Sequence, residues 1–497
     1  MDVQVNQGNI QDSVADTIIV NLFKGVTSPS GATGAVDQAL NNGISELISN
    51  GDLKGNSGEV VTLYPRGAIA AKRVLVVGLG SADDLDLEGV RKAAATAVNQ
   101  ARKLNARHVA TVVHGAGIGG LAVEAAAQAV VEGSLLALYQ IDADKKKSEE
   151  DANSIEQITI VEFDGEKIAA IEQGAKAGQA IVTGVNLARH LVNMPANVTT
   201  PTQMAETATL IAHNHKMKLT IGDRQWAAEH NMGAFLAVAK GAGEEPKFIV
   251  LEHNSERNDL DTIVLVGKGI TFDTGGISIK PSERMGLMKT DMGGAAAVLG
   301  AMKVVGMLDI PLRVIGITPC TENMPDANAY RPADVIKASN GKTIEIISTD
   351  AEGRMVLADG LVYAARYNPK AVVDLATLTG ACVVALGSTA AGLFATEDDL
   401  RDKLVAAGQQ AHERLWPLPL WEDYKEFIKS DVADIKNTGG RMGGVATSAV
   451  FLQEFTDYPW AHLDIAGVTY SEKAKPYSPA GATGFGVRLL TEFLRQW

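Results

Sequence analysis

The sequence predicts a two-domain α/β protein. Three observations lead to this prediction: the chain has 497 residues, strand-like and helix-like segments alternate along it, and 50 residues are glycine. A chain of this length exceeds what one simple hydrophobic core usually holds, so two domains are expected. Alternating strands and helices are typical of parallel or mixed sheets covered by helices, and glycines supply the tight turns between them.

Residues 1–165 form the smaller, N-terminal α/β domain of this prediction. Short runs of apolar and β-branched residues there are typical of strands, and two alanine-rich stretches between them have a helical pattern. The predicted strands are 17–20, 60–64, 74–77, 108–113 and 158–161, and the predicted helices are 90–104 and 121–139. The charge run Asp144–Asp151 is interpreted as a solvated loop.

A long linker helix is predicted over residues 166–194, which are rich in alanine and contain no proline. Pro195 and Pro201 then stop helical continuation. Residues 195–497 form the larger domain, with a mixed, mostly parallel sheet flanked by helices. The predicted strands are 248–251, 262–266, 313–318, 344–347, 371–375 and 462–465, and helices are predicted to begin at Thr202, Asp291, Arg354, Asp398 and Thr447.

Composition restricts the classes of function. The net charge of −14 argues against a nucleic-acid platform built on overall charge. Cys320 and Cys382 lie far apart in apolar surroundings, which indicates buried thiols in a reducing compartment. No secretory signal pattern begins the chain, and glycines interrupt the uncharged window Leu375–Ala395, which is interpreted as strand, turn and helix. We therefore expect a cytoplasmic protein without a membrane span.

Charged residues gather on glycine-rich loops that follow predicted strands. Lys268 and Asp273 follow the strand ending at residue 266, and Asp350, Glu352 and Arg354 follow the strand ending at residue 347. Thr377 and Gly380 follow a third strand, which ends near residue 375. Because ligands of open α/β sheets bind at the carboxyl ends of strands, these loops are expected to converge on one crevice.

The carboxylates of these loops predict a metal site. Asp350 and Glu352 face the same way in an extended backbone, and like charges repel unless a cation separates them. With Asp273 and Asp291 they offer the hard oxygen ligands that suit divalent ions, two of which would lie about 3.5–4 Å apart. Asp291 also precedes a helix of small residues, so helix capping alone would explain it. Lys268, judged from its surroundings, is interpreted as a salt-bridge partner.

Several motifs of the second half resemble those of the leucyl aminopeptidases of the cytosol aminopeptidase (M17) family. One is Lys-Gly-Ile-Thr-Phe-Asp-Thr-Gly-Gly-Ile-Ser-Ile-Lys at residues 268–280, and another is Thr-Asp-Ala-Glu-Gly-Arg at residues 349–354. Residues 288–296, 374–380 and 462–467 carry the others. The resemblance implies a macro-like N-terminal domain, a catalytic second domain and release of N-terminal residues, preferably leucine and other apolar ones, from peptides with a free N-terminus.

The resemblance also implies roles for single residues. One metal position would be held by Asp273, Asp350 and Glu352, and a second by Lys268, Asp273, Asp291 and Glu352, with Lys268 as a neutral amine. The ions would be Mn²⁺ or Zn²⁺, or else Mg²⁺, with a hydroxide bridging them. Lys280 would stabilise the oxyanion, and Arg354 would hold a bicarbonate ion that carries the proton. The side-chain pocket would be shaped by Met288, Thr377 and Gly380, and the chain would form a homohexamer, a dimer of trimers.

Other interpretations were weighed against this one. The glycine run Gly115–Gly120 fits G-x-G-x-x-G, but no strand with a terminal acidic residue follows soon enough, so a tight turn is preferred to a dinucleotide site. Asp273-Thr-Gly lacks the second copy that aspartic proteases need. Another two-metal hydrolase, such as a phosphoesterase, is the enzymatic alternative. Some bacterial family members also bind DNA, a role to which the acidic composition gives no support.

Overall fold

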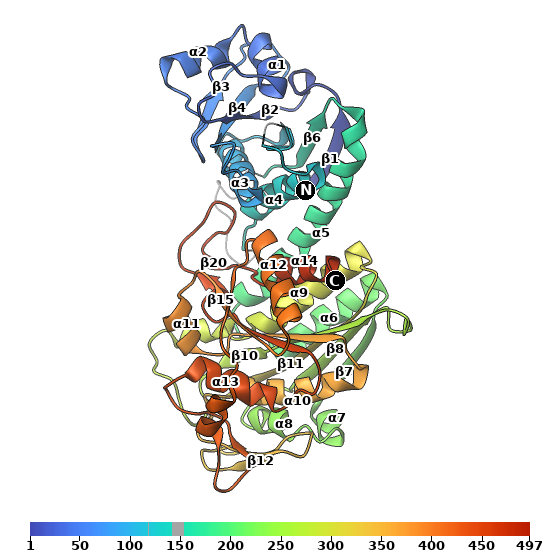
Figure 1. Cartoon of the computed structure of the whole chain (residues 1–497), viewed down its shortest axis with the longest axis vertical. Coiled ribbons are helices and arrows are strands. Elements are labelled where there is room, and N and C mark those ends of the chain that lie inside the picture. The colour runs from blue at the N-terminus through green and yellow to red at the C-terminus, as the bar shows by residue number, and fades with distance from the viewer. Residues whose placement is uncertain (118, 142–153) are drawn as a thin grey trace. The chain divides into compact units, whose positions relative to one another are not determined.

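The computed structural model describes the whole chain except residue 118 and residues 142–153 (Figure 1). Contacts divide the chain into two compact units, residues 1–182 with 473–479, and residues 183–472 with 480–497. The division passes through α5 (Ile168–Asn193), the long helix that the sequence predicts. The charge run Asp144–Asp151 lies outside the described residues.

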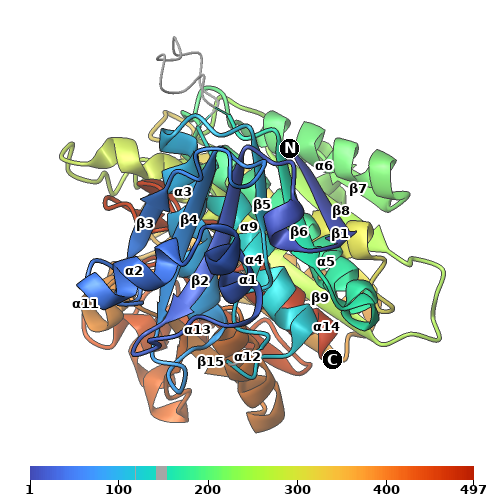
Figure 2. The same ribbon diagram turned by 90° about the horizontal axis from the view of Figure 1, so that it is seen from above.

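The first unit contains a six-stranded sheet in the order β1-β6-β5-β2-β4-β3, part of which can be followed in Figure 2. Neighbouring strands are parallel except at the β3 edge, which is antiparallel to β4. Five of the six were predicted, and β1 was missed because its apolar residues are few. The strands are β1 (Asp2–Gln7), β2 (Thr17–Phe23), β3 (Val60–Leu63), β4 (Arg73–Gly80), β5 (His108–Thr111) and β6 (Gln157–Glu162).

Helices cover both faces of this sheet. The alternation along β2 shows the two layers, because Ile18, Val20 and Leu22 pack in one core with α1 (Gly31–Ala39) and α2 (Gly43–Asn50). Ile19 points the other way, into a core with α3 (Leu87–Lys103), and α4 (Val123–Ala137) packs beside α3. The sequence prediction found α3 and α4 but missed the two short helices, whose glycines weaken the helical pattern.

The second unit is built on a mixed sheet in the order β16-β15-β18-β14-β9-β11-β8-β7, with β10 beside β11. The central pairs β18–β14, β14–β9 and β9–β11 are parallel. The strands are β7 (Lys218–Gly222), β8 (Lys247–His253), β9 (Thr262–Gly267), β10 (Gly269–Asp273), β11 (Arg313–Asn323), β14 (Ala371–Ala376), β15 (Ala391–Ala395), β16 (Leu415–Pro417) and β18 (Trp460–Asp464). All but β7, β10, β15 and β16 were predicted.

The helices of this unit begin within three residues of the five predicted starts. They are α6 (Pro201–His215), α9 (Gly293–Leu308), α10 (Gly353–Ala364), α12 (Asp398–Gln410) and α13 (Gly444–Gln453). The prediction missed α7 (Arg224–Glu229), α8 (Gly233–Ala239) and α14 (Val487–Arg495), whereas α11 (Gly380–Leu386) lies in the window Leu375–Ala395, where a helix was expected. Val264 and Val266 of β9 pack in one core with α8, α10 and α13, whereas α9 contacts β9, β11 and β14.

One predicted strand belongs to a different sheet. The strand expected at residues 344–347 is β13 (Thr343–Glu345), which pairs with β12 (Val335–Lys337) and β17 (Ile435–Lys436) in a separate three-stranded sheet. β13 has only three residues, and so short a strand carries too little pattern in the sequence to show with which strands it pairs. The loop carrying Asp350 and Glu352 therefore does not follow a strand of the central sheet, as had been expected.

The apolar segments of the chain are core segments. The window Leu375–Ala395 forms the end of β14, helix α11 and β15, close to the expected strand, turn and helix. Among the described residues one helical segment, Met285–Leu308, is long and apolar enough to span a membrane, but 78% of its most apolar window is buried inside the protein. Cys320 and Cys382 are both free and buried, as predicted.

Candidate active site

The site begins at the carboxyl ends of two adjacent parallel strands, β9 and β14. Lys268 follows β9, and its backbone N–H donates to the carbonyl of Leu375 in β14, at 3.0 Å. Its own carbonyl accepts from the N–H of Ala295 in α9, at 2.9 Å. These two bonds fix the backbone of Lys268 between the sheet and α9, so that the position of its side chain is set by the core.

The side chain of Lys268 is enclosed by acceptors. Its Nζ lies 2.7 Å from an Asp291 oxygen and 2.9 Å from a Glu352 oxygen, and it donates to the carbonyl of Thr377 at 3.1 Å. Only 3% of Lys268 is exposed. Burial alone lowers the pKa of Lys268, but the attraction of Asp291 and Glu352 outweighs it and raises that pKa above its usual value. Lys268 is therefore paired with two of the carboxylates that are predicted to hold metal.

The second lysine binds a different pair of carboxylates. Lys280 Nζ lies 2.9 Å from an Asp273 oxygen and 2.5 Å from an Asp350 oxygen. Burial lowers its pKa, and the neighbouring carboxylates, Asp273 first, raise it further than burial lowers it. About 23% of its side chain is exposed, so Lys280 reaches solvent where Lys268 does not.

Three carboxylates lie close enough together to share a cation. One oxygen from each of Asp273, Asp350 and Glu352 lies within 4.8 Å of the others. Burial, followed by repulsion from Asp273, raises the pKa of Glu352 to about 8, and burial with the same repulsion raises that of Asp291 to about 6. Two lysines thus leave the negative charge of four carboxylates only partly compensated. A carboxylate cluster of this kind, in which Asp350 is exposed and the other three residues are buried, is stabilised by a bound cation.

Asp291 does not cap a helix. It ends the 3₁₀ segment Met285–Thr290, and the residue at the N-cap of α9 is Met292, so the capping interpretation is wrong. One Asp291 oxygen pairs with Lys268, and the other accepts from the hydroxyl of Thr377 at 2.7 Å. Two residues of the predicted site therefore orient this carboxylate instead.

Asn323, at the end of β11, was missed by the sequence prediction. Its Nδ2 donates to an Asp273 oxygen at 2.8 Å, to the carbonyl of Thr349 at 3.0 Å and to a Glu352 oxygen at 3.5 Å. The hydroxyl of Thr349 also donates to the carbonyl of Gly275, at 2.6 Å. The sequence could have indicated Asn323, because it lies at the carboxyl end of a central strand. It was missed because that strand was predicted to end five residues too early.

Arg354, Gly380 and Met288 lie two or three residues along the chain from Glu352, Thr377 and Asp291 respectively. Arg354, in the first turn of the buried helix α10, donates from Nη1 to the carbonyl of Asn437 at 2.9 Å, and burial lowers its pKa to about 10. Gly380 begins α11, whose N-cap is Thr379. Met288 is half-buried in the 3₁₀ segment before Asp291.

Comparison with known proteins decides the family. The model of the cytosol aminopeptidase family catalytic domain matches residues 186–491, and that of the family's N-terminal domain matches residues 19–148. A probable cytosol aminopeptidase of Roseiflexus castenholzii is 43% identical over 503 residues, covering 100% of this chain and 99% of the relative. The chain belongs to the cytosol aminopeptidase family. It is therefore a metallo-aminopeptidase that acts on peptides. The alternative function, that of a phosphoesterase, is wrong.

Other cytosol aminopeptidases and related structures agree over nearly the whole chain. A probable cytosol aminopeptidase of Geobacter sulfurreducens is 44% identical, covering 93% of this chain and 92% of the relative. The structure of a tomato leucine aminopeptidase mutant matches with a TM-score of 0.88 and 35% identity, covering 100% of this chain and 97% of that one. The bottromycin maturation enzyme BotP in complex with Mn gives a TM-score of 0.85 with 36% identity, covering 97% and 99%.

Proposed function

We propose that this aminopeptidase releases leucine and other apolar residues from the N-terminus of peptides, with two divalent metal ions at the carboxylate cluster. The observation that carries the proposal is the convergence of Asp273, Asp350 and Glu352, with oxygens within 4.8 Å of one another. Hard carboxylate oxygens in this number suit divalent cations, and the uncompensated negative charge of the cluster favours them further.

We infer one metal position at Asp273, Asp350 and Glu352, and a second at Lys268, Asp273, Asp291 and Glu352. Lys268 would bind as a neutral amine, since a neighbouring dication lowers the pKa of an ammonium group. When bound, two such ions acidify a water molecule and so supply hydroxide near neutral pH. The Mn of the related BotP structure supports Mn²⁺ as one choice beside Zn²⁺ and Mg²⁺.

Other residues near the proposed metal positions would bind the substrate and stabilise the charge that develops on it. The partly exposed ammonium of Lys280 is placed to donate to the carbonyl oxygen of the scissile bond as negative charge develops there. The free α-amine of a peptide would bind one of the metals, whereas the acylated nitrogen of a blocked peptide is a poor metal ligand. Thr377, Met288 and Gly380, on the segments beside Asp291 and before α11, would shape the pocket for an apolar side chain.

Arg354 is the proposed holder of a bicarbonate ion that carries a proton between water and the leaving amine. Its Nε is buried and has no hydrogen-bond partner among the described residues, while Nη1 is held by Asn437. A planar guanidinium with an unused N–H fits a planar anion. By family resemblance we also propose a cytoplasmic homohexamer, a dimer of trimers. Nothing in the acidic composition favours DNA binding.

Removal of the metals is expected to abolish hydrolysis of Leu-anilide, because the nucleophile depends on them. Prolonged dialysis against a chelator, followed by return of Mn²⁺, Zn²⁺ or Mg²⁺ one at a time, gives the activity with each ion. N-acetylated Leu-anilide is the matched control, since it lacks only the α-ammonium group. Activity that survives verified removal of metal, or that is equal on the acetylated substrate, would contradict the proposal.

Replacement of Asn323 by alanine is expected to weaken metal binding by about 10–100-fold, the range typical of residues that orient metal ligands. The change removes the donor that holds Asp273 and the carbonyl of Thr349. Titration of the metal-stripped protein measures the affinity. Asn328→Ala is the control, because Asn328 is exposed and, within the described part of the chain, its side chain bonds only with the nearby Asp326. Unchanged metal affinity in a folded Asn323→Ala protein would show that Asn323 does not position the ligands.

A further inference from the structure

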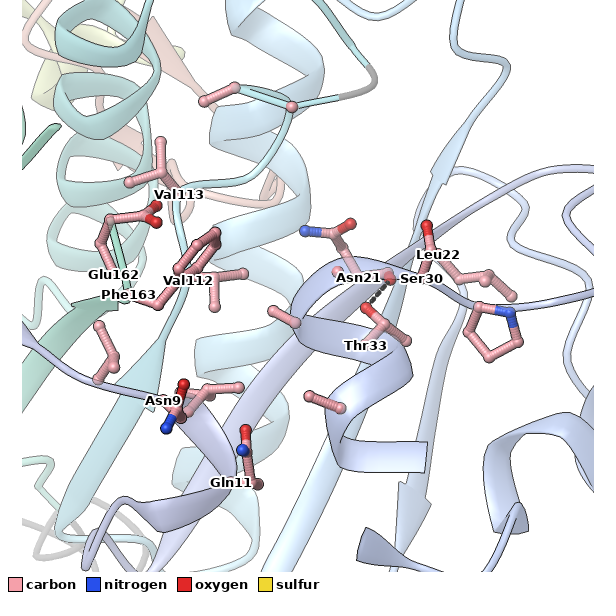
Figure 3. Close-up of a pocket in the computed structure, with 18 of the residues that line it drawn as sticks. Asn9, Gln11, Asn21, Leu22, Ser30, Thr33, Val112, Val113, Glu162 and Phe163 are labelled. Carbon is pink, nitrogen blue, oxygen red and sulfur yellow. Dashed lines mark hydrogen bonds between the residues drawn. The ribbon is translucent and has the colours of Figure 1, made fainter. Parts of the chain in front are cut away.

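A cavity of about 410 Å³ lies in the first unit, and none of its lining residues belongs to the carboxylate cluster (Figure 3). Its walls come from the carboxyl ends of four neighbouring parallel strands, β1, β6, β5 and β2. The segments that follow β1 and β5 complete it, including Asn9, Val112 and the backbone of Gly115–Gly117. Its volume falls within the range of small-molecule sites, about 300–1,000 Å³.

The cavity lies where the connections that follow two neighbouring strands leave toward opposite faces of the sheet. From β2 the chain continues into α1 and α2, which pack on one face, whereas from β5 it continues into α4, on the face of α3. β2 and β5 are neighbours in the sheet. In open α/β sheets, a crevice opens where the connections from adjacent parallel strands leave in opposite directions, and ligands bind there.

The first turn of α1 forms one wall of this cavity. Residues Ser30–Thr33 line it, and the hydroxyl of Thr33 donates to the carbonyl of Asn21 at 2.6 Å, which ties the turn to the end of β2. Ser30 at the N-cap makes no side-chain capping bond, and the first N–H bonded within the helix is that of Gly34. The N–H groups before it in the first turn of this nine-residue helix bond to none of the described residues, and such groups bind anions such as phosphate.

Polar side chains in the wall have unused acceptors. Asn21 lines the cavity, and its Nδ2 donates to Nδ1 of the buried His114 at 3.0 Å. Burial lowers the pKa of His114 to about 4, so this ring is neutral and holds the amide in one orientation, which leaves Oδ1 of Asn21 as an acceptor. Gln11 also lines the cavity, and its buried Oε1 has no hydrogen-bond partner among the described residues.

An aromatic ring lies at the cavity as well. Phe163, which follows β6, is 68% exposed, although it is a large apolar side chain. In Figure 3 its ring lies beside Val112, across the cavity from Ser30 and Thr33. An exposed ring over an apolar wall provides a surface on which a flat heterocycle stacks. The anion-binding turn and the stacking surface thus line opposite sides of one cavity.

We propose that this cavity binds a nucleoside phosphate, with its phosphate at the first turn of α1 and its base stacked on the exposed ring of Phe163. Oδ1 of Asn21 and the buried Oε1 of Gln11 accept from the amino or hydroxyl groups of the ligand. This site is independent of the proposed metal centre, and no residue is shared between them.

Isothermal titration of the full-length, metal-loaded protein with ADP, adenosine and inorganic phosphate tests the proposal. We expect one ADP per chain, bound about tenfold or more tightly than either fragment, because each fragment fills one side of the cavity. Failure of ADP to bind at millimolar concentration would overturn the proposal. Equal affinities for ADP and inorganic phosphate would also overturn it, because the base would then make no contact.

Two variants test whether ADP binds in this cavity and not at the metals. Ala32→Glu places a negative charge in the first turn of α1, where it repels phosphate but suits the helix, and Phe163→Ala removes the stacking ring. Each is expected to weaken ADP binding about tenfold or more and to leave aminopeptidase activity unchanged. The controls are Gln38→Glu, at the other end of α1, and Tyr64→Ala, another exposed aromatic of the same unit. Unweakened ADP binding in both variants would place the ligand elsewhere and overturn the assignment.

Discussion

Replacement of Asp350 by alanine is expected to remove bound metal and aminopeptidase activity together. Asp350 contributes one of the three carboxylates whose oxygens lie within 4.8 Å of one another. Without it, two carboxylates and their neighbours must hold the ion, and the hydroxide that depends on the ion is no longer supplied. Loss of metal assistance is worth several kcal/mol of transition-state stabilisation, which corresponds to a fall in kcat of roughly a thousandfold or more.

The measurement for Asp350→Ala pairs metal content after dialysis with the rate of Leu-anilide hydrolysis. Asp326→Ala is the matched control, because Asp326 is an exposed aspartate whose carboxylate, among the described residues, accepts hydrogen bonds from Asn328 alone. That variant should keep both metal and activity. If Asp350→Ala kept its full metal content and lost only activity, Asp350 would act on the substrate, and the first metal position would need a different ligand.

The cluster was predictable because its residues follow buried strands on glycine-rich loops. Lys268 and Asp273 come directly after β9 and within β10, and the apolar run of β9 is clear in the sequence. The convergence of Asp350 and Glu352 was expected for a reason that proved wrong, since β13 belongs to a separate small sheet. What brings these two carboxylates to the site is the bonding of the Thr349 backbone and side chain to Asn323 and Gly275.

These side-chain-to-backbone bonds leave no periodic pattern in the sequence, which is why Asn323 and Thr349 were missed. The same limit applies to the N-terminal unit. Its buried strands and alanine-rich helices were predicted, but α1, with two glycines in nine residues, was not. The helix that forms a wall of the proposed nucleotide cavity is therefore visible only in the structure.

The two lysines of the cluster differ in what they can reach. Lys268 is 3% exposed and its Nζ is surrounded by Asp291, Glu352 and the carbonyl of Thr377, so no substrate atom can approach it without displacing one of them. Lys280 keeps 23% of its side chain exposed while it contacts Asp273 and Asp350. This difference supports the proposal that Lys268 is a metal ligand and that Lys280 contacts the substrate.

Replacement of Lys280 by alanine is accordingly expected to leave metal binding intact and to lower kcat by about 10²–10³-fold, the loss typical of one oxyanion donor. Lys280 repels a cation that approaches Asp273 and Asp350, so its removal makes the cluster more negative and does not weaken metal binding. Metal content together with separate values of kcat and KM tests this. Lys280→Arg keeps the positive charge and should recover part of kcat, because a guanidinium places its donors differently. Loss of metal from Lys280→Ala would instead make Lys280 a structural support of the ligands.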